Sequence, residues 1–311
     1  VKIFAVLSLG LVAFLSGWPG IQADTTHMDV RAPHSVSTFS NADRLADRPV
    51  KSEASAFTGM ADSQSTVRNA FSSDEDWSLE AIHAAPSGMA VSRRPVLVAV
   101  LDTGIDASHE ELVGRIAKHL CFVEDCEVTD RLGHGTFIAG IIAADDSNDV
   151  GITGLAPESL LLNVKVADDK GMCRQSDLVE GIIWAVDNGA MVINISIELS
   201  EYTSPLEEAV EYAWNNGALV IAAAGNEGNT IPVYPAAFDN CVSVTGIDQN
   251  MDIAPLANHG NWVDVAAPGF MIYGVLPGDA YGYRHGTSFA TAYVSGLTAR
   301  LFPLASLSLI H

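Results

Sequence analysis

Basic residues are scarce in this sequence. Only 16 Lys and Arg stand against 38 Asp and Glu in 311 residues, which gives a formal net charge of −22 at pH 7. A protein that binds nucleic acid needs a basic surface to meet the phosphates, and basic segments are what attract a chain to an anionic membrane surface. We therefore expect no nucleic-acid partner and no docking on anionic lipid, and we expect a protein that works as a monomer.

Cysteine is also scarce, with four residues in the whole chain. This number is too low for a fold that depends on disulfides. No Cys lies in a catalytic motif, and the Cys and His residues lack the spacing of a zinc site. Four cysteines allow three sets of pairs, among which we favour a local Cys121–Cys126 disulfide, with Cys173 and Cys241 far away in the sequence.

Long apolar runs are absent after the first residues of the chain. Lys2 is followed by about a dozen apolar residues, up to Leu15, which is the length of a signal-peptide core and short for a membrane span. We predict that residues 1–23 are a signal peptide and that the protein is secreted or periplasmic, without stable membrane insertion. An uncleaved membrane anchor and a buried helix remain alternatives.

Apolar periodicity is absent from residues 24–73, a segment in which Ser recurs nine times. This composition is typical of a leader or propeptide, or of a disordered linker. The pattern of a packed domain begins at about residue 74 and continues to residue 311. Hydrophobic residues make up 48% of the chain, which is enough for a sizeable core.

Within residues 74–311, short apolar runs alternate with helical patterns. The runs that predict buried strands are 96–101, 160–166, 191–196, 218–224 and 241–245, and the predicted helices are 136–144, 176–188 and 206–216. Gly189 and Gly217 follow two of these helices, where a helix commonly ends. The alternation predicts an α/β fold with a mostly parallel central sheet and helices on both faces.

Four polar residues occupy positions suited to catalysis. Asp102 directly follows a buried strand, at the edge of a parallel sheet where ligands gather. His134 lies between two glycines at the start of a helix, and an imidazole can exchange a proton at neutral pH. Ser288 precedes an apolar helix and needs such a base to become a nucleophile. Asn226 follows a strand, where its amide can donate to a developing oxyanion.

Taken together, in the order Asp, His, Asn, Ser, these motifs resemble those of the subtilisin-like serine proteases, the subtilase family. The likeness extends from about residue 77 to residue 301 and includes three further stretches, 154–157, 234–237 and 262–269. It implies the three-layer subtilisin-like fold, a catalytic triad of Asp102, His134 and Ser288, and an oxyanion-hole side chain at Asn226. The implied function is a serine endopeptidase that hydrolyses peptide bonds in proteins or peptides through an acyl-enzyme on Ser288.

The resemblance also implies a substrate groove, whose candidate residues are Ser196, Ile197, Glu198, Ala223, Gly225 and Val233. Glu198 stands where the family usually has Gly, and it adds bulk and charge beside the groove. We therefore predict an altered subsite preference. Val233, near the base of the main specificity pocket, favours a medium apolar side chain at P1, the substrate residue that supplies the attacked carbonyl.

Other departures concern packing and the end of the chain. Phe137, Phe289 and Ala292 replace a common His, Met and Pro, and we expect these apolar changes to be tolerated. Only 23 residues follow Ser288, where the family normally continues further, so we expect that the C-terminus is truncated. A catalytically silent, peptide-binding relative remains an alternative. An α/β-hydrolase esterase does not fit, because Gly-x-Ser-x-Gly is missing and the order of the triad differs.

Calcium is the cofactor that the resemblance implies. Several subtilases bind it with a carboxylate near the first motif and a loop after the His helix. The residues at those places are Glu111, Asp145, Asp146, Ser147, Asn148, Val150 and Ile152. Oxygen-rich side chains and loop carbonyls suit this hard cation. The alternative is an ordinary solvated acidic turn.

Overall fold

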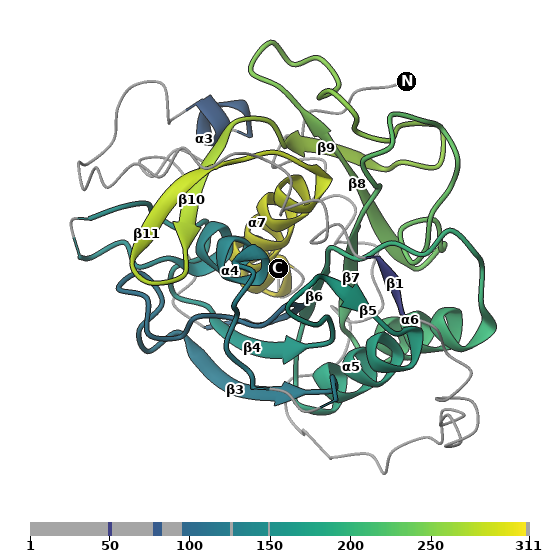
Figure 1. Cartoon of the computed structure of the whole chain (residues 1–311), viewed down its shortest axis with the longest axis horizontal. Helices are drawn as coiled ribbons and strands as arrows, with labels where there is room; N and C mark the ends of the chain where they lie inside the picture. The colour runs from purple at the N-terminus through teal and green to yellow at the C-terminus, as the bar shows by residue number, and fades with distance from the viewer. Residues whose placement is uncertain (1–48, 52–76, 83–94, 125–126, 149, 309–311) are drawn as a thin grey trace.

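A computed structural model describes residues 49–51, 77–82, 95–124, 127–148 and 150–308 (Figure 1). The signal peptide predicted at residues 1–23 lies outside these residues, as does most of the leader predicted at 24–73. The fold therefore bears on the domain predicted to begin at about residue 74.

The domain is organised around a seven-stranded sheet with the strand order β3-β4-β2-β6-β7-β8-β9, in which every neighbouring pair is parallel. The strands are β2 (Leu97–Asp102), β3 (Ile116–Cys121), β4 (Leu160–Lys165), β6 (Val192–Ile195), β7 (Leu219–Ala223), β8 (Cys241–Ile247) and β9 (Val265–Pro268). The inner strands β6, β7 and β8 are buried along their whole length, as expected of continuous apolar runs between two layers. The edge strand β3 carries Lys118 and His119 instead and is partly exposed.

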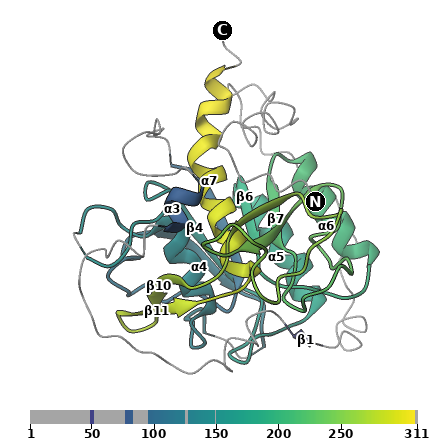
Figure 2. The same ribbon diagram turned by 90° about the horizontal axis from the view of Figure 1, so that it is seen from above.

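Helices cover both faces of the sheet (Figures 1 and 2). On one face, α4 (His134–Ala143) packs with α7 (Thr287–Ser308), and on the other, α5 (Gln175–Asp187) packs with α6 (Ser204–Asn215). The buried apolar side chains accordingly form two clusters, one beneath each pair of helices. This three-layer arrangement confirms the predicted α/β fold class.

Smaller elements surround the layers. A hairpin of β10 (Ile272–Leu276) and β11 (Ala280–Arg284) packs on α4 (Figure 1), and the short helix α3 (Trp77–Ala81) contacts β9. The strand β1 (Val50–Lys51) pairs antiparallel with β5 (Met172–Cys173). A segment of the predicted leader thus lies against the domain in extended form.

Two further predictions concern the membrane and the cysteines. Among the described residues, no helix has the length and apolar character needed to cross a bilayer. Cys121 is disulfide-bonded, but Cys126, its predicted partner, lies outside the described residues. Cys173 and Cys241 are buried thiols, and burial raises the pKa of the Cys241 thiol well above its ordinary value.

Candidate active site

The sheet positions Asp102 and His134 for a direct hydrogen bond. Asp102 is the last residue of β2, and His134 is the first residue of α4, after Gly133 with φ 93°. His134 Nδ1 donates to Asp102 Oδ1 at 2.8 Å, and both side chains are almost fully buried. With Nδ1 as the donor, the neutral ring leaves Nε2 as a proton acceptor, which is the tautomer that a general base requires.

Asp130, which the sequence analysis missed, holds the start of α4. Its Oδ1 accepts hydrogen bonds from the amides of Leu132 (3.0 Å) and Gly133 (2.8 Å), and its Oδ2 accepts from the amide and the hydroxyl of Thr136, both at 2.8 Å. A carboxylate is favoured at a helix N-terminus because unpaired amides point toward it there. Burial raises the pKa of Asp130, and the nearby Asp102 raises it further.

Thr103 connects the two carboxylates. Its hydroxyl lies 2.9 Å from Asp130 Oδ1 and 3.2 Å from Asp102 Oδ1, and it also accepts a hydrogen bond from the Gly135 amide at 3.1 Å. The strand end that carries Asp102 and the helix start that carries His134 are therefore joined by one buried network. The signal in the sequence was an Asp four residues before a helix-initial His, three positions ahead of the usual N-cap position, which Gly133 occupies here.

Ser288 is the second residue of α7 and is 2% exposed. Ser196 Oγ donates to the Ser288 carbonyl oxygen at 3.4 Å, so the predicted groove segment borders the nucleophile helix. The rings of His134 and Phe289 lie 5.7 Å apart, centroid to centroid, and Phe289 packs on Phe137 of α4 at 4.7 Å. The helix of the predicted base and the helix of the predicted nucleophile thus meet through aromatic side chains.

Asn226 lies beside the same helix start. Its Oδ1 accepts the Thr287 amide at 2.9 Å, and Thr287 Oγ1 accepts the Gly225 amide at 3.1 Å. Because the carbonyl side of the Asn226 amide is engaged, its Nδ2 group is the side that can donate to an oxyanion. The structure therefore brings Asn226 next to Ser288, although 62 residues separate them in the sequence.

Asn258 is a second residue that the sequence analysis missed. It is fully buried, its Nδ2 donates to the Ala224 carbonyl at 2.9 Å, and its Oδ1 accepts the amides of Glu227 (3.0 Å) and Asn229 (3.1 Å). The loop that carries Asn226 is wrapped around this one side chain. No local sequence pattern predicts that Asn258 holds this loop, because its backbone partners lie about thirty residues away in the sequence.

The predicted groove residues come together as well. Ser196, Ile197, Ala223 and Val233 are buried, and Leu199 and Tyr234 exchange backbone hydrogen bonds of 2.8 and 2.9 Å that join the two outer segments. Glu198 is half-buried. Its carboxylate lies so close to Gly225 that a Cβ at residue 225 would overlap it.

The predicted calcium residues come together only in part. The Glu111 carboxylate is fully buried and accepts hydrogen bonds from the Ile152 amide (2.9 Å) and from Asn148 Nδ2 (3.0 Å). Asp145 instead pairs with Arg115 at 2.9 Å and accepts from Ser147. Asp146 and Ser147 are exposed, and the amide of Val150 donates to Asn148 Oδ1 at 3.2 Å. Within the described ranges, no three His, Cys, Asp or Glu side chains are placed to hold a metal.

Burial raises the pKa of the Glu111 carboxyl, which its hydrogen bonds only partly offset. A buried carboxylate of this kind has a lone pair left for one more partner, since it accepts three hydrogen bonds here, including one from the Tyr281 hydroxyl at 3.1 Å. The donor set, one carboxylate with an amide and nearby loop carbonyls, has the oxygen chemistry that Ca²⁺ prefers.

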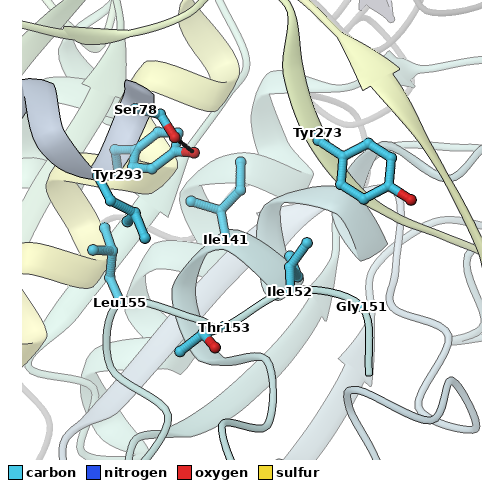
Figure 3. A pocket seen from close by; sticks show the side chains of 9 residues that line it. Ser78, Ile141, Gly151, Ile152, Thr153, Leu155, Tyr273 and Tyr293 are labelled. Atoms are coloured by element: carbon cyan, nitrogen blue, oxygen red, sulfur yellow. Dashed lines mark hydrogen bonds between the residues drawn. The ribbon is translucent and has the colours of Figure 1, made fainter. Parts of the chain in front are cut away.

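A separate pocket lies at α3, α4, α7 and β10 (Figure 3). Its lining is Ser78, Leu79, Ile141, Gly151, Ile152, Thr153, Leu155, Tyr273 and Tyr293. Figure 3 shows the hydrogen bond in which the Tyr293 hydroxyl donates to Ser78 Oγ, at 2.8 Å. None of the predicted catalytic residues lines this pocket, so we assign it no part in catalysis.

A buried Asp–His pair at the carboxyl edge of a parallel sheet, with a Ser at the head of a neighbouring helix, is the arrangement expected of a serine hydrolase with an α/β fold. Residues 93–305 match the subtilase family, peptidase family S8. The chain belongs to the subtilase family, which confirms the resemblance seen in the sequence.

Characterised relatives agree with this assignment. The chain is 44% identical over 205 residues to the thermophilic serine proteinase of Bacillus sp. (strain AK1), 42% identical over 205 residues to thermitase of Thermoactinomyces vulgaris, and 38% identical over 225 residues to subtilisin DY of Bacillus licheniformis. These alignments cover 66%, 66% and 70% of this chain, and 51%, 74% and 81% of the three relatives. The chain thus spans about half the length of the AK1 proteinase. The family and these relatives support a serine-type endopeptidase, and no observation favours the catalytically silent alternative.

Proposed function

We propose that this protein is a serine endopeptidase that cuts proteins and peptides through an acyl-enzyme on Ser288. The observation that carries the proposal is the buried Asp102–His134 hydrogen bond of 2.8 Å beside the helix that begins with Thr287 and Ser288. The arrangement supplies an oriented base, a nucleophile at a helix N-terminus and an amide side chain at Asn226.

The reaction follows from these positions. His134 Nε2 takes the proton of Ser288 as its Oγ attacks the peptide carbonyl, and Asp102 stabilises the resulting imidazolium. The tetrahedral oxyanion is stabilised by Asn226 Nδ2 and the Ser288 amide. His134 then gives the proton to the departing amine, and a water molecule attacks the acyl-enzyme with His134 as base again, which releases the acid and restores the Ser288 hydroxyl.

The groove residues Ser196, Ile197, Glu198, Ala223, Gly225 and Val233 are proposed to bind the peptide on the acyl side. Support comes from two contacts with the start of α7. Ser196 Oγ donates to the Ser288 carbonyl oxygen at 3.4 Å, and the Gly225 amide donates to Thr287 Oγ1 at 3.1 Å.

The test of the activity is covalent labelling with a fluorophosphonate probe, together with casein hydrolysis. We expect labelling of the wild type and none of Ser288→Ala. The matched control is Ser204→Ala, at an exposed Ser at the start of α6, and it should label like the wild type. Labelling that survives Ser288→Ala would falsify the assignment of the nucleophile, and a folded wild type that neither labels nor cuts casein would favour the silent alternative.

We also propose that residues 1–23 direct export, to the medium or the periplasm, and that residues 24–73 are a leader removed from an enzyme that works as a monomer. The support is the apolar run after Lys2 and the Ser-rich composition that follows it. N-terminal sequencing and size measurement of the exported enzyme test this. We expect a new N-terminus near residue 74 and the mass of one chain, whereas enzyme retained in the cytoplasm with residues 1–23 still attached would contradict it.

Calcium is proposed as a structural ion held by the Glu111 carboxylate, by Asn148 and by carbonyls of the loop that includes Val150 and Ile152. Bound there, the cation would neutralise a buried negative charge and stabilise the folded state. In the Ser288→Ala background, which prevents self-digestion, we expect calcium to raise Tm for the parent and for the exposed control Glu211→Gln, but not for Glu111→Gln. A parent Tm that does not respond to calcium or chelator would rule the ion out.

A further inference from the structure

The Glu198 carboxylate lies between two segments that border Ser288. Its own segment begins at Ser196, whose hydroxyl contacts the Ser288 carbonyl oxygen at 3.4 Å. On the other side, the buried Glu198 Oε2 lies against Gly225, the residue that directly precedes Asn226. The charge is therefore placed against the loop that carries Asn226, and it belongs to a segment that contacts the Ser288 backbone.

The side chain of the substrate P1 residue must lie near this charge. The attacked carbonyl carbon is held between Ser288 Oγ and Asn226 Nδ2, and the P1 side chain departs from the adjacent carbon. We expect that side chain to leave along the segments that contain Ser196 and Gly225, because these two segments contact the start of α7, at the Ser288 carbonyl oxygen and at Thr287 Oγ1. A negative group placed there attracts a cationic side chain and disfavours an anionic one.

We propose that Glu198 makes this enzyme selective for Lys or Arg at P1. The inference rests on the proposed endopeptidase function. The proposed P1 preference differs from the medium apolar side chain expected from Val233. The buried apolar residues of the groove still contact the substrate side chain in this proposal. Long basic side chains lie with their methylene stems on apolar surface while the charged head meets a carboxylate.

The overall charge supports the same substrate class. With a net charge of −22, the protein attracts basic peptides over a distance, which speeds their encounter with the site. The competing explanation is that Glu198 acts only through its bulk, by narrowing the space beside Gly225. That explanation predicts a preference for small P1 residues with no regard to charge.

The experiment compares kcat/KM for tetrapeptide anilides that are identical except for Lys, Arg, Leu, Ala or Glu at P1. For the wild type we expect Lys and Arg to exceed Leu by about ten-fold or more, with Glu the poorest. Glu198→Gln keeps the bulk and removes the charge, so the preference for Lys over Leu should disappear. The matched control is Glu201→Gln, at an exposed Glu three residues further along, and it should keep the wild-type ratio.

Fluorophosphonate labelling of Ser288 tests the proposed protease function separately from the role of Glu198, and it shows that each variant is folded. A wild type that labels and cuts but prefers Leu or Ala overturns the role of Glu198 and leaves the protease in place. A wild type that does not label and cuts none of the peptides overturns the proposed function and this inference with it. A second measurement needs no variant, because about 1 M salt should shrink the Lys-over-Leu ratio of the wild type if charge is the cause; a ratio that salt leaves unchanged contradicts the proposal.

Discussion

The two sides of the candidate site are held by different kinds of anchor. On the His134 side, the buried Asp130 carboxylate accepts hydrogen bonds from the start of α4. On the Asn226 side, the buried Asn258 amide both accepts from the loop and donates to it. A carboxylate suits the first place because a helix N-terminus offers only donors, and an amide suits the second because the loop offers donors and an acceptor. The balance of backbone donors and acceptors at each place, more than polarity alone, determines which side chain fits there.

The largest effect should come from the base itself. His134→Ala removes the group that takes the Ser288 proton, and we expect kcat/KM on a peptide substrate to fall by at least about 10⁴-fold. Steady-state kinetics measure it, with labelling by a fluorophosphonate as an independent readout. A loss of less than about ten-fold would mean that another group serves as the base. The His134 side of the site, which Asp130 holds in place, would then not be the catalytic side.

The oxyanion side should contribute less. Asn226→Ala removes one of two donors, and a loss of about 10²–10³-fold in kcat is expected, with little change in KM, because the interaction is made with the transition state. Asn226→Asp serves as the comparison, since its carboxylate retains the shape but repels an oxyanion. If KM rises while kcat stays constant, Asn226 binds the substrate in its ground state and is not part of an oxyanion hole.

Exchanging the chemistry of the two anchors tests the comparison directly. Asp130→Asn places an NH₂ group against donors, and Asn258→Asp loses the donor to Ala224 and adds a buried charge. Each should destabilise the protein by about 1–3 kcal/mol, with Asn258→Asp the larger loss because of the buried charge. Urea denaturation in the Ser288→Ala background measures this, and a variant that is as stable as its parent would show that its anchor is dispensable.

The smallest effect expected concerns pH. Because the pKa of Asp130 is raised from 3.8 in the folded protein, the folded state binds more protons than the unfolded state just above that value. The stability contributed by the protonated form of Asp130 is therefore full below about pH 4 and is lost as pH rises through the raised pKa. The loss of unfolding free energy caused by Asp130→Asn should accordingly become smaller from acid toward neutral pH. The loss caused by Asn258→Ala should stay constant. A cost of Asp130→Asn that grows with pH would contradict the buried, ionisable anchor.

Much of this arrangement was predictable from sequence, for a physical reason. Buried parallel strands are continuous apolar runs, so 96–101 and 218–224 indicated β2 and β7, and the polar residues just past their ends indicated Asp102 and Asn226. The start of α4 was placed two residues late, because a helix after a left-handed Gly133 needs no Ser or Thr cap. The role of Asn258 depends on backbone groups up to 34 residues away, which composition and periodicity do not record. The role of Asp130 depends on where α4 begins, since its amide partners Leu132, Gly133 and Thr136 lie at the start of that helix. The two-residue strand β5 and the hairpin of β10 and β11 lack the long apolar runs that indicated the strands of the central sheet.

The aromatic contact between Phe137 and Phe289 is an apolar link between the helix of the base and the helix of the nucleophile. Gly274 of the hairpin fits against the Phe137 ring, where a Cβ would overlap it. Apolar contacts weaken on cooling, whereas the hydrogen bonds of Asp102 and Asp130 have no such dependence on water structure. Cold should therefore loosen the spacing between the two helices before it loosens the Asp–His pair, which makes catalysis at low temperature a matter of how these two rings pack.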